Sequence, residues 1–117
     1  MPPHTWQACE LGRVGRVGLG FTDAAALPAA WGGGCLYTAV AEDSRDAIAD
    51  GACVASGIGR LDAQGRPCGF RRLHGAPKVE GIDLQPGPRG RVTLCLATDP
   101  DDPLRASQLL RATLAGF

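Results

Sequence analysis

Two apolar runs decide the fold class of this chain: Cys35-Leu36-Tyr37-Thr38-Ala39-Val40-Ala41 and Arg91-Val92-Thr93-Leu94-Cys95-Leu96-Ala97-Thr98. Continuous runs of this kind are typical of strands that are buried on both faces. The first run follows a triple-glycine turn at 32–34, and the second is stopped by Asp99-Pro100. Glycine and proline interrupt the whole sequence about every ten residues, which is the rhythm of short strands joined by turns. The sequence therefore predicts an all-β fold.

The strands predicted around these two runs fall into two groups of similar order. Asp62-Ala63-Gln64-Gly65 has the composition of a hairpin turn within the first group. The predicted strands are 5–11, 20–27, 35–41, 54–62, 68–73, 79–84, 91–98 and 107–114. We expect one β domain over 1–117, divided into a leading strand with a glycine-rich link (5–19), a first unit (20–74) and a second unit (76–115).

Segments of the first unit match segments of the second unit in the same order. They are 22–27 with 79–84, 40–43 with 96–99, and 55–60 with 106–111, at offsets of 57, 56 and 51 residues. A period of about 40–55 residues with four strands per unit is typical of propeller blades. The repeat therefore predicts about two four-stranded propeller blades.

The C-terminal segment carries two conflicting patterns. Asp102-Pro103 would cap and begin a helix, and the apolar residues that follow have helical spacing. The repeat instead makes residues 107–114 the third strand of a blade. Tertiary context often overrides local propensity in short segments, so we predict the strand.

Composition excludes several classes of protein. The formal net charge is zero, so no basic excess exists to follow a nucleic-acid backbone. No apolar run approaches the roughly 20 residues that span a bilayer, and the first residues lack the order of a secretory signal. We therefore expect a cytoplasmic protein that binds neither nucleic acid nor membrane. The five cysteines form no closely spaced pair, which favours reduced, metal-free thiols over a zinc site.

Four stretches carry a resemblance to a known family: Phe21–Leu27, Ala39–Asp43, Lys78–Gly81 and Thr98–Pro103. Together they resemble the C-terminal third of an uncharacterised family of bacterial six-bladed β-propeller-like proteins. That family is distantly similar to esterase-like phytase and gluconolactonase-type propellers. The resemblance covers roughly residues 20–114 and implies a propeller fold. It implies no assured function, because fold-level analogy does not transfer one.

Members of that family are far longer than this chain, which has strands for only two blades. Three copies would complete a six-bladed ring if each copy lent its leading strand (5–11) to a neighbour. Closure of this kind would hide sheet edges that two isolated blades expose. We therefore predict a homo-oligomer, with a trimer favoured. The alternative is a fragment of a longer propeller gene.

The repeat also aligns acidic residues. It places Asp23 and Glu80 at equivalent positions on the innermost strand of each unit, and Asp43 and Asp99 at the end of each second strand. Hard cations such as calcium prefer several carboxylate and carbonyl oxygens, so Asp23 and Glu80 are metal candidates near a propeller axis. Asp43 and Asp99 are further candidates for binding a ligand or a metal ion. The alternative is that these acids accept hydrogen bonds from backbone amides at turns and strand ends.

Three functions remain open from the sequence. The first is a non-catalytic β-propeller-type module that binds a ligand or a protein. The second is a metal-dependent hydrolase of the lactonase or phosphoesterase kind, in which Asp23, Glu80 and a divalent ion activate water. The third is a degenerate fragment without a function of its own.

Overall fold

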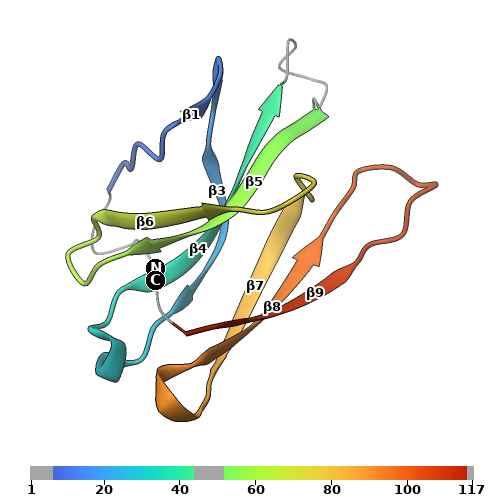
Figure 1. The fold of residues 1–117 in the computed structure, drawn as a ribbon. Coiled ribbons are helices and arrows are strands. Elements are labelled where there is room, and N and C mark those ends of the chain that lie inside the picture. Colours follow the sequence, from blue (N-terminus) through green and yellow to red (C-terminus); the bar gives the residue numbers. More distant parts are fainter. Residues whose placement is uncertain (1–6, 44–51, 116–117) are drawn as a thin grey trace, which may run out of the picture.

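A computed structural model describes residues 7–43 and 52–115, and these residues form an all-β fold (Figure 1). The main strands form two antiparallel meanders. The four-stranded sheet comprises β3 (Gly20–Ala26), β4 (Cys35–Asp43), β5 (Ala52–Leu61) and β6 (Pro67–Arg72). The three-stranded sheet comprises β7 (Val79–Pro86), β8 (Val92–Thr98) and β9 (Leu109–Leu114). The helical elements of the described residues are two short 3-10 turns, η1 (Ala29–Trp31) and η2 (Pro88–Gly90), so the predicted all-β class is confirmed.

Glycine and aspartate form the predicted turns of the four-stranded sheet. Between β3 and β4, residues 32–34 all have a positive φ of 76–89°, which glycine adopts without steric cost. A Cβ atom on Gly34 would also lie 2.1 Å from the carbonyl oxygen of Leu61. Between β5 and β6, Oδ1 of Asp62 accepts hydrogen bonds from the backbone amides of Gln64 and Arg66, each at 2.9 Å. These turns fix the order of the meander.

The N-terminal segment differs from its prediction. The leading strand expected over 5–11 is absent from the part of it that the structure describes, residues 7–11. The expected glycine-rich link instead folds into a small hairpin, β1 (Arg13–Val14) and β2 (Val17–Gly18), around Gly15 with a φ of 61°. This hairpin contacts β4. The segment before it lacks strand structure because no described strand pairs with it.

The C-terminal segment is a strand, as the repeat predicted. The helix signal at Asp102-Pro103 produces a single turn, in which Oδ1 of Asp102 accepts the amide of Leu104 at 2.9 Å. The carbonyl oxygen of Asp102 accepts the amide of Arg105 at 3.0 Å. The chain then enters β9, because pairing with β8 satisfies the backbone over six residues. Tertiary pairing has therefore overridden the local propensity.

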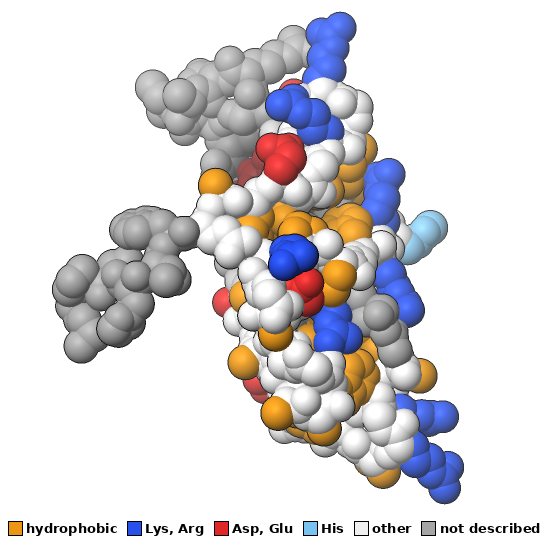
Figure 2. Space-filling view, turned by 90° about the vertical axis from the view of Figure 1, so that its left-hand side faces the viewer, with side chains coloured by type: hydrophobic (Ala, Val, Ile, Leu, Met, Phe, Trp, Pro, Cys, Tyr) orange, Lys and Arg blue, Asp and Glu red, His pale blue; other side chains and the backbone are white. Residues whose placement is uncertain are grey.

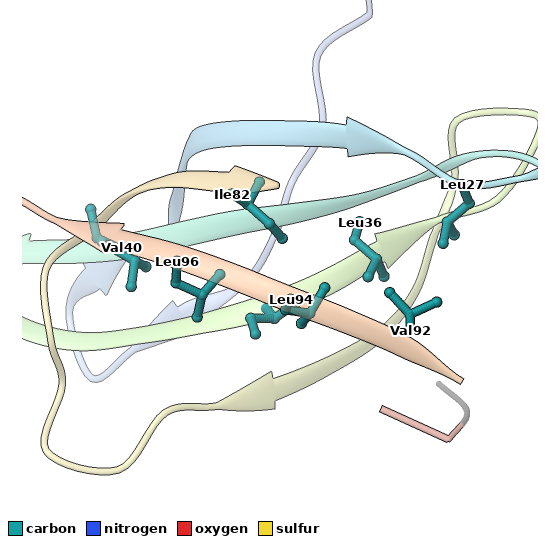
Figure 3. Close-up of a cluster of buried hydrophobic side chains, with 9 residues drawn as sticks. Leu27, Leu36, Val40, Ile82, Val92, Leu94 and Leu96 are labelled. Carbon is teal, nitrogen blue, oxygen red and sulfur yellow. The ribbon is translucent and has the colours of Figure 1, made fainter. Parts of the chain in front are cut away.

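One hydrophobic core lies between the two sheets. Leu36 and Val40 of β4 point toward Leu94 and Leu96 of β8 (Figure 3), and Ile58 of β5 belongs to the same buried cluster. The other buried members of this core are Leu27, Val79, Ile82 and Val92. The innermost strands of the two sheets, β3 and β7, lie next to each other, and β4 also contacts β7.

The two predicted central strands are buried differently. All residues of β4 from Leu36 to Ala41 are buried, so both of its faces are covered as predicted. In β8, burial alternates along the strand, with Thr93, Cys95 and Ala97 only partly buried. The expectation that β8 is buried on both faces is therefore wrong. The core covers one face of β8, and the other face is partly accessible to solvent.

Candidate functional site

Asp23 connects the two sheets through their backbones. Its Oδ2 accepts a hydrogen bond from the amide of Ile82 on β7 at 2.9 Å, and its Oδ1 accepts the adjacent amide of Ala24 at 2.8 Å. Beside it, the hydroxyl groups of Thr22 and Thr38 are 2.7 Å apart. Asp23 therefore has the role of a backbone acceptor, which is the alternative to metal binding that the sequence left open.

Strand pairing changes the equivalence between Asp23 and Glu80. Both innermost strands contain a β-bulge, between Phe21 and Asp23 in β3 and between Val79 and Gly81 in β7. The pairing makes Glu80 equivalent to Thr22, with an offset of 58 residues (80 − 22), instead of the predicted 57. A shift of one residue exchanges the two faces of a strand. Asp23 and Glu80 therefore occupy different positions on their strands.

Glu80 belongs to a charge cluster around Lys78. The ammonium of Lys78, with only 11% of its side chain exposed, lies 3.3 Å from Oε2 of Glu42 and 4.0 Å from Oε1 of Glu80. It also forms an ion pair with Oδ2 of Asp101. We call these four residues the lysine cluster. It joins the end of β4, the start of β7 and the β8–β9 connection through one side chain.

Asp43 and Asp99, the other two predicted acids, lie at the same end of the sheets as the lysine cluster. Asp43 is exposed and ends β4. Asp99 follows β8, where its amide donates to the carbonyl of Lys78 at 2.9 Å and its Oδ1 accepts the amide of Asp101 at 3.0 Å. This second contact is typical of an aspartate that closes its own turn. Within residues 7–43 and 52–115, no three His, Cys, Asp or Glu side chains form a group that could hold a metal ion.

A cleft opens beside the lysine cluster, with a volume of about 910 Å³. The start of β5, the β6–β7 connection and the β8–β9 connection form its walls. We call it the end cleft. Its polar lining residues are Cys53, His74, Lys78, Thr98, Asp101, Arg105 and Gln108. Ala76, Pro77 and Leu110 add apolar surface, so the cleft combines hydrogen-bonding groups with an apolar wall.

Two nitrogen-bearing side chains of the end cleft have no acidic partner within ion-pair distance among the described residues. They are the exposed side chains of His74 and Arg105. Lys78, in contrast, is already surrounded by three carboxylates. The side chains of His74 and Arg105 therefore remain available for a ligand.

Cys53 contributes a protonated thiol to the end cleft. Burial raises the pKa of this thiol above its usual value, the backbone at Ala55 lowers it, and Glu42 adds to the increase. Its Sγ also lies 3.3 Å from the carbonyl oxygen of Ala55. Because the thiolate is the nucleophilic form, Cys53 has the character of a structural thiol rather than a reactive one.

Comparison with known families assigns the chain. A family model described as a family of unknown function, DUF6910, matches residues 1–103. The chain belongs to the DUF6910 family. No curated protein and no solved structure matches it. The match to DUF6910 extends from β1 to β8 and includes most of the end cleft. None of the described residues forms a helix that is long and apolar enough to cross a membrane.

This DUF6910 member also has an aromatic cluster on the face of the four-stranded sheet that points away from the core. Tyr37 contacts Phe21 edge-on, with ring centroids 5.0 Å apart, and stacks on Phe70 at 6.4 Å. The rings lie directly over two glycines, since a Cβ on Gly59 would lie 2.0 Å from Tyr37 and one on Gly57 would lie 2.4 Å from Phe70. Both glycines therefore allow the aromatic rings to pack closely on β5. A shallow pocket of about 330 Å³ adjoins Phe21 and Tyr37.

The central residues of the DUF6910 cleft were not among the predicted site residues. Lys78, the hub of the cluster, is the only lysine in a chain with eleven arginines, and that contrast is visible in the sequence. An ammonium is a compact charge that several carboxylates can surround, whereas a planar guanidinium is less suited to this arrangement. His74 and Arg105 have no distinctive sequence context. Only the fold shows that their two connections meet.

Proposed function

We propose that this protein is a non-catalytic ligand-binding module of the β-propeller type, with the end cleft as its binding site. The observation that carries this proposal is the cleft itself. Its volume of about 910 Å³ lies within the range of about 300–1,000 Å³ that is typical of small-molecule sites. Its lining combines an apolar wall with His74, Arg105 and Gln108, and such a combination can orient a small polar ligand.

Two features favour binding over catalysis in the end cleft. The Cys53 thiol stays protonated at neutral pH, because burial raises its pKa. The carboxylate of Asp101 is paired with Lys78, which makes it a poor general base. Iodoacetamide should therefore alkylate Cys53 more slowly than the exposed Cys68 at neutral pH. Faster alkylation of Cys53 would favour an enzyme.

The two sheets are, in this proposal, successive blades of a propeller. Support comes from the shared meander order, from the bulge at the same place in β3 and β7, and from the contact between these innermost strands. The resemblance to six-bladed propellers supports the same conclusion. Three copies would then complete a six-bladed ring, so the functional form is a homotrimer. The end cleft, between adjacent sheets, would occur three times in that ring.

Ligand binding can be tested with a thermal-shift screen of small carboxylic acids, amino acids and sugars. At least one compound should raise the melting temperature of the wild type by mass action. Arg105→Ala should remove this shift. Arg91→Ala is the matched control, because Arg91 is an exposed arginine at the opposite end of β8. A screen without any shift, or a shift that Arg105→Ala leaves unchanged, would refute the end cleft as the site.

A further inference from the structure

The outer edges of the two sheets differ in how they are protected against pairing with another strand. The edge strand β6 begins with Pro67 and ends with Arg71 and Arg72. Proline and charged side chains are common means by which natural edge strands avoid pairing. The edge strand β9 contains no proline, and Arg111 is its only charged residue. The side chain of Leu109, at the start of β9, is 77% exposed.

The position beyond β9 corresponds to the position of β6 in the other sheet. β9 pairs with β8 as β5 pairs with β4, and β6 then covers the far side of β5. Among residues 7–43 and 52–115, no strand pairs with the far side of β9. The three-stranded sheet therefore has an open hydrogen-bonding edge at the place where the four-stranded sheet has its last strand.

Residues 7–11 have the pattern of a strand but form no ladder in this chain. Cys9 and Leu11 are partly buried, and Glu10 between them is exposed. The segment is attached mainly through side chains, with Nε2 of Gln7 donating to the carbonyl of Gly65 at 2.5 Å and Sγ of Cys9 at 3.9 Å from the same oxygen. If residues 7–11 left this position, no backbone ladder among the described residues would be broken.

The side chains of residues 7–11 complement those of β9. On β9, Leu110 and Leu114 pack against the core, and Arg111 is exposed on the other face. A strand added at this edge with Cys9 and Leu11 on the core face would place Glu10 on the face of Arg111. Neither Glu10 nor Arg111 has an ion-pair partner among the described residues. Opposite charges on neighbouring strands stabilise a sheet.

We propose that the β9 edge accepts residues 7–11 of a second copy of the chain. The donor is a second copy because, within the chain, Gln7 and Cys9 contact Gly65 in the β5–β6 turn of the other sheet. This inference rests on the ring closure in the proposed function, and it specifies the two surfaces that make the contact. It does not depend on a ligand in the end cleft.

Light scattering on the full chain, with edge variants, tests this contact. The wild type should have a mass that is a multiple of 12.1 kDa. Leu109→Lys should weaken assembly at least several-fold, because a charge would then protect the edge. Cys68→Lys, at an exposed position of the already protected edge strand β6, is the matched control and should leave the assembly unchanged. Far-UV circular dichroism would verify that each variant remains folded.

A charge exchange gives a second test that a folding defect would not mimic. Glu10→Arg and Arg111→Glu should each weaken assembly, and the double variant should restore it. A trimer with this response supports both the β9 contact and the ring. A dimer with this response supports the contact and refutes the ring. A trimer that does not respond to these changes, or a wild-type monomer at micromolar concentration, overturns the β9 contact.

Discussion

The two sheets of this molecule are built alike and covered differently. Both are antiparallel meanders, and both have a bulge at the same point of the innermost strand. Yet β4 is buried on both faces, whereas β8 is fully buried only on its core face. The four-stranded sheet ends in a protected edge, and the three-stranded sheet ends in β9, with the exposed Leu109.

This difference indicates where the chain can associate with another molecule. The hydrophobic band across the face in Figure 2, with Lys and Arg along one border, shows that apolar surface remains accessible on the molecule. A sheet that is covered on both faces has little left to bury, while a partly exposed face and an open edge can still gain contacts. In the proposed assembly, the three-stranded sheet is the part of the fold that a second copy completes.

The largest effect is expected from a charge on the outer face of the central strand β4, and the same change on β8 provides the comparison. Ala39 on β4 is fully buried, so Ala39→Asp should cost at least about 4 kcal/mol, since it buries a carboxylate without a partner. The corresponding change on β8, Ala97→Asp, should cost about 1 kcal/mol, the span of strand propensities, because Ala97 is partly exposed. Urea unfolding measures both losses. Equal losses would mean that the two faces are covered alike.

A second comparison uses one glycine from each sheet. In the four-stranded sheet, Gly59→Ala should cost about 3 kcal/mol, because its Cβ would lie 2.0 Å from the Tyr37 ring. In the three-stranded sheet, Gly81→Ala meets only ordinary contacts, the nearest at 3.5 Å to Cβ of Ala97. Its effect should stay within about 1 kcal/mol. Thermal unfolding would check this, and a tolerated Gly59→Ala would contradict the ring packing over that glycine.

Much of the fold follows from sequence patterns because turn chemistry and strand chemistry are local. Gly34 and Asp62 specify their turns through their own conformations and hydrogen bonds, and both turns form where predicted. The β9 strand required the repeat, since Asp102-Pro103 locally favours a helix. The cover of β8 was not predictable, because the runs in β4 and β8 read alike and only distant segments decide which faces are covered.

The candidate site was predicted less well, also for a physical reason. The repeat aligned Asp23 with Glu80, but the bulge positions make Glu80 equivalent to Thr22, one residue away from Asp23. Asp23 therefore accepts a hydrogen bond from the Ile82 amide, whereas Glu80 lies near the Lys78 ammonium. The end cleft forms where three connections meet. Its residues share no spacing along the chain, so no sequence motif could indicate them.

A third prediction concerns the lysine cluster, which spans the junction between the sheets. Lys78→Met should cost about 1.5–3 kcal/mol, because it removes the charge partner of Glu42 and Asp101. The three carboxylates would then lack a cation, so added calcium should raise the melting temperature of the variant more than that of the wild type. Arg91→Ala, far from the cluster, should have neither effect. A calcium response that is the same in both proteins would contradict this role of Lys78.

The smallest loss of stability is expected at Asp23, which links the two sheets by a hydrogen bond. Asp23→Asn should lower the free energy of unfolding by about 1 kcal/mol. The asparagine side chain can place its NH2 group, which is a donor, opposite the amide of Ile82, where Asp23 has an acceptor. Asp83→Asn, at an exposed position of β7, is the matched control and should be nearly neutral.

The two roles that are possible for Asp23, backbone acceptor and metal ligand, predict different responses to calcium. A backbone acceptor gives the same loss in calcium and in a chelator, and we expect this result because both carboxylate oxygens already accept amides. A cation site formed with Glu80 would instead stabilise the wild type when calcium is added, and Asp23→Asn would remove most of that gain. Melting temperatures of the three proteins in calcium and in a chelator therefore decide whether Asp23 joins the sheets alone or together with a metal ion.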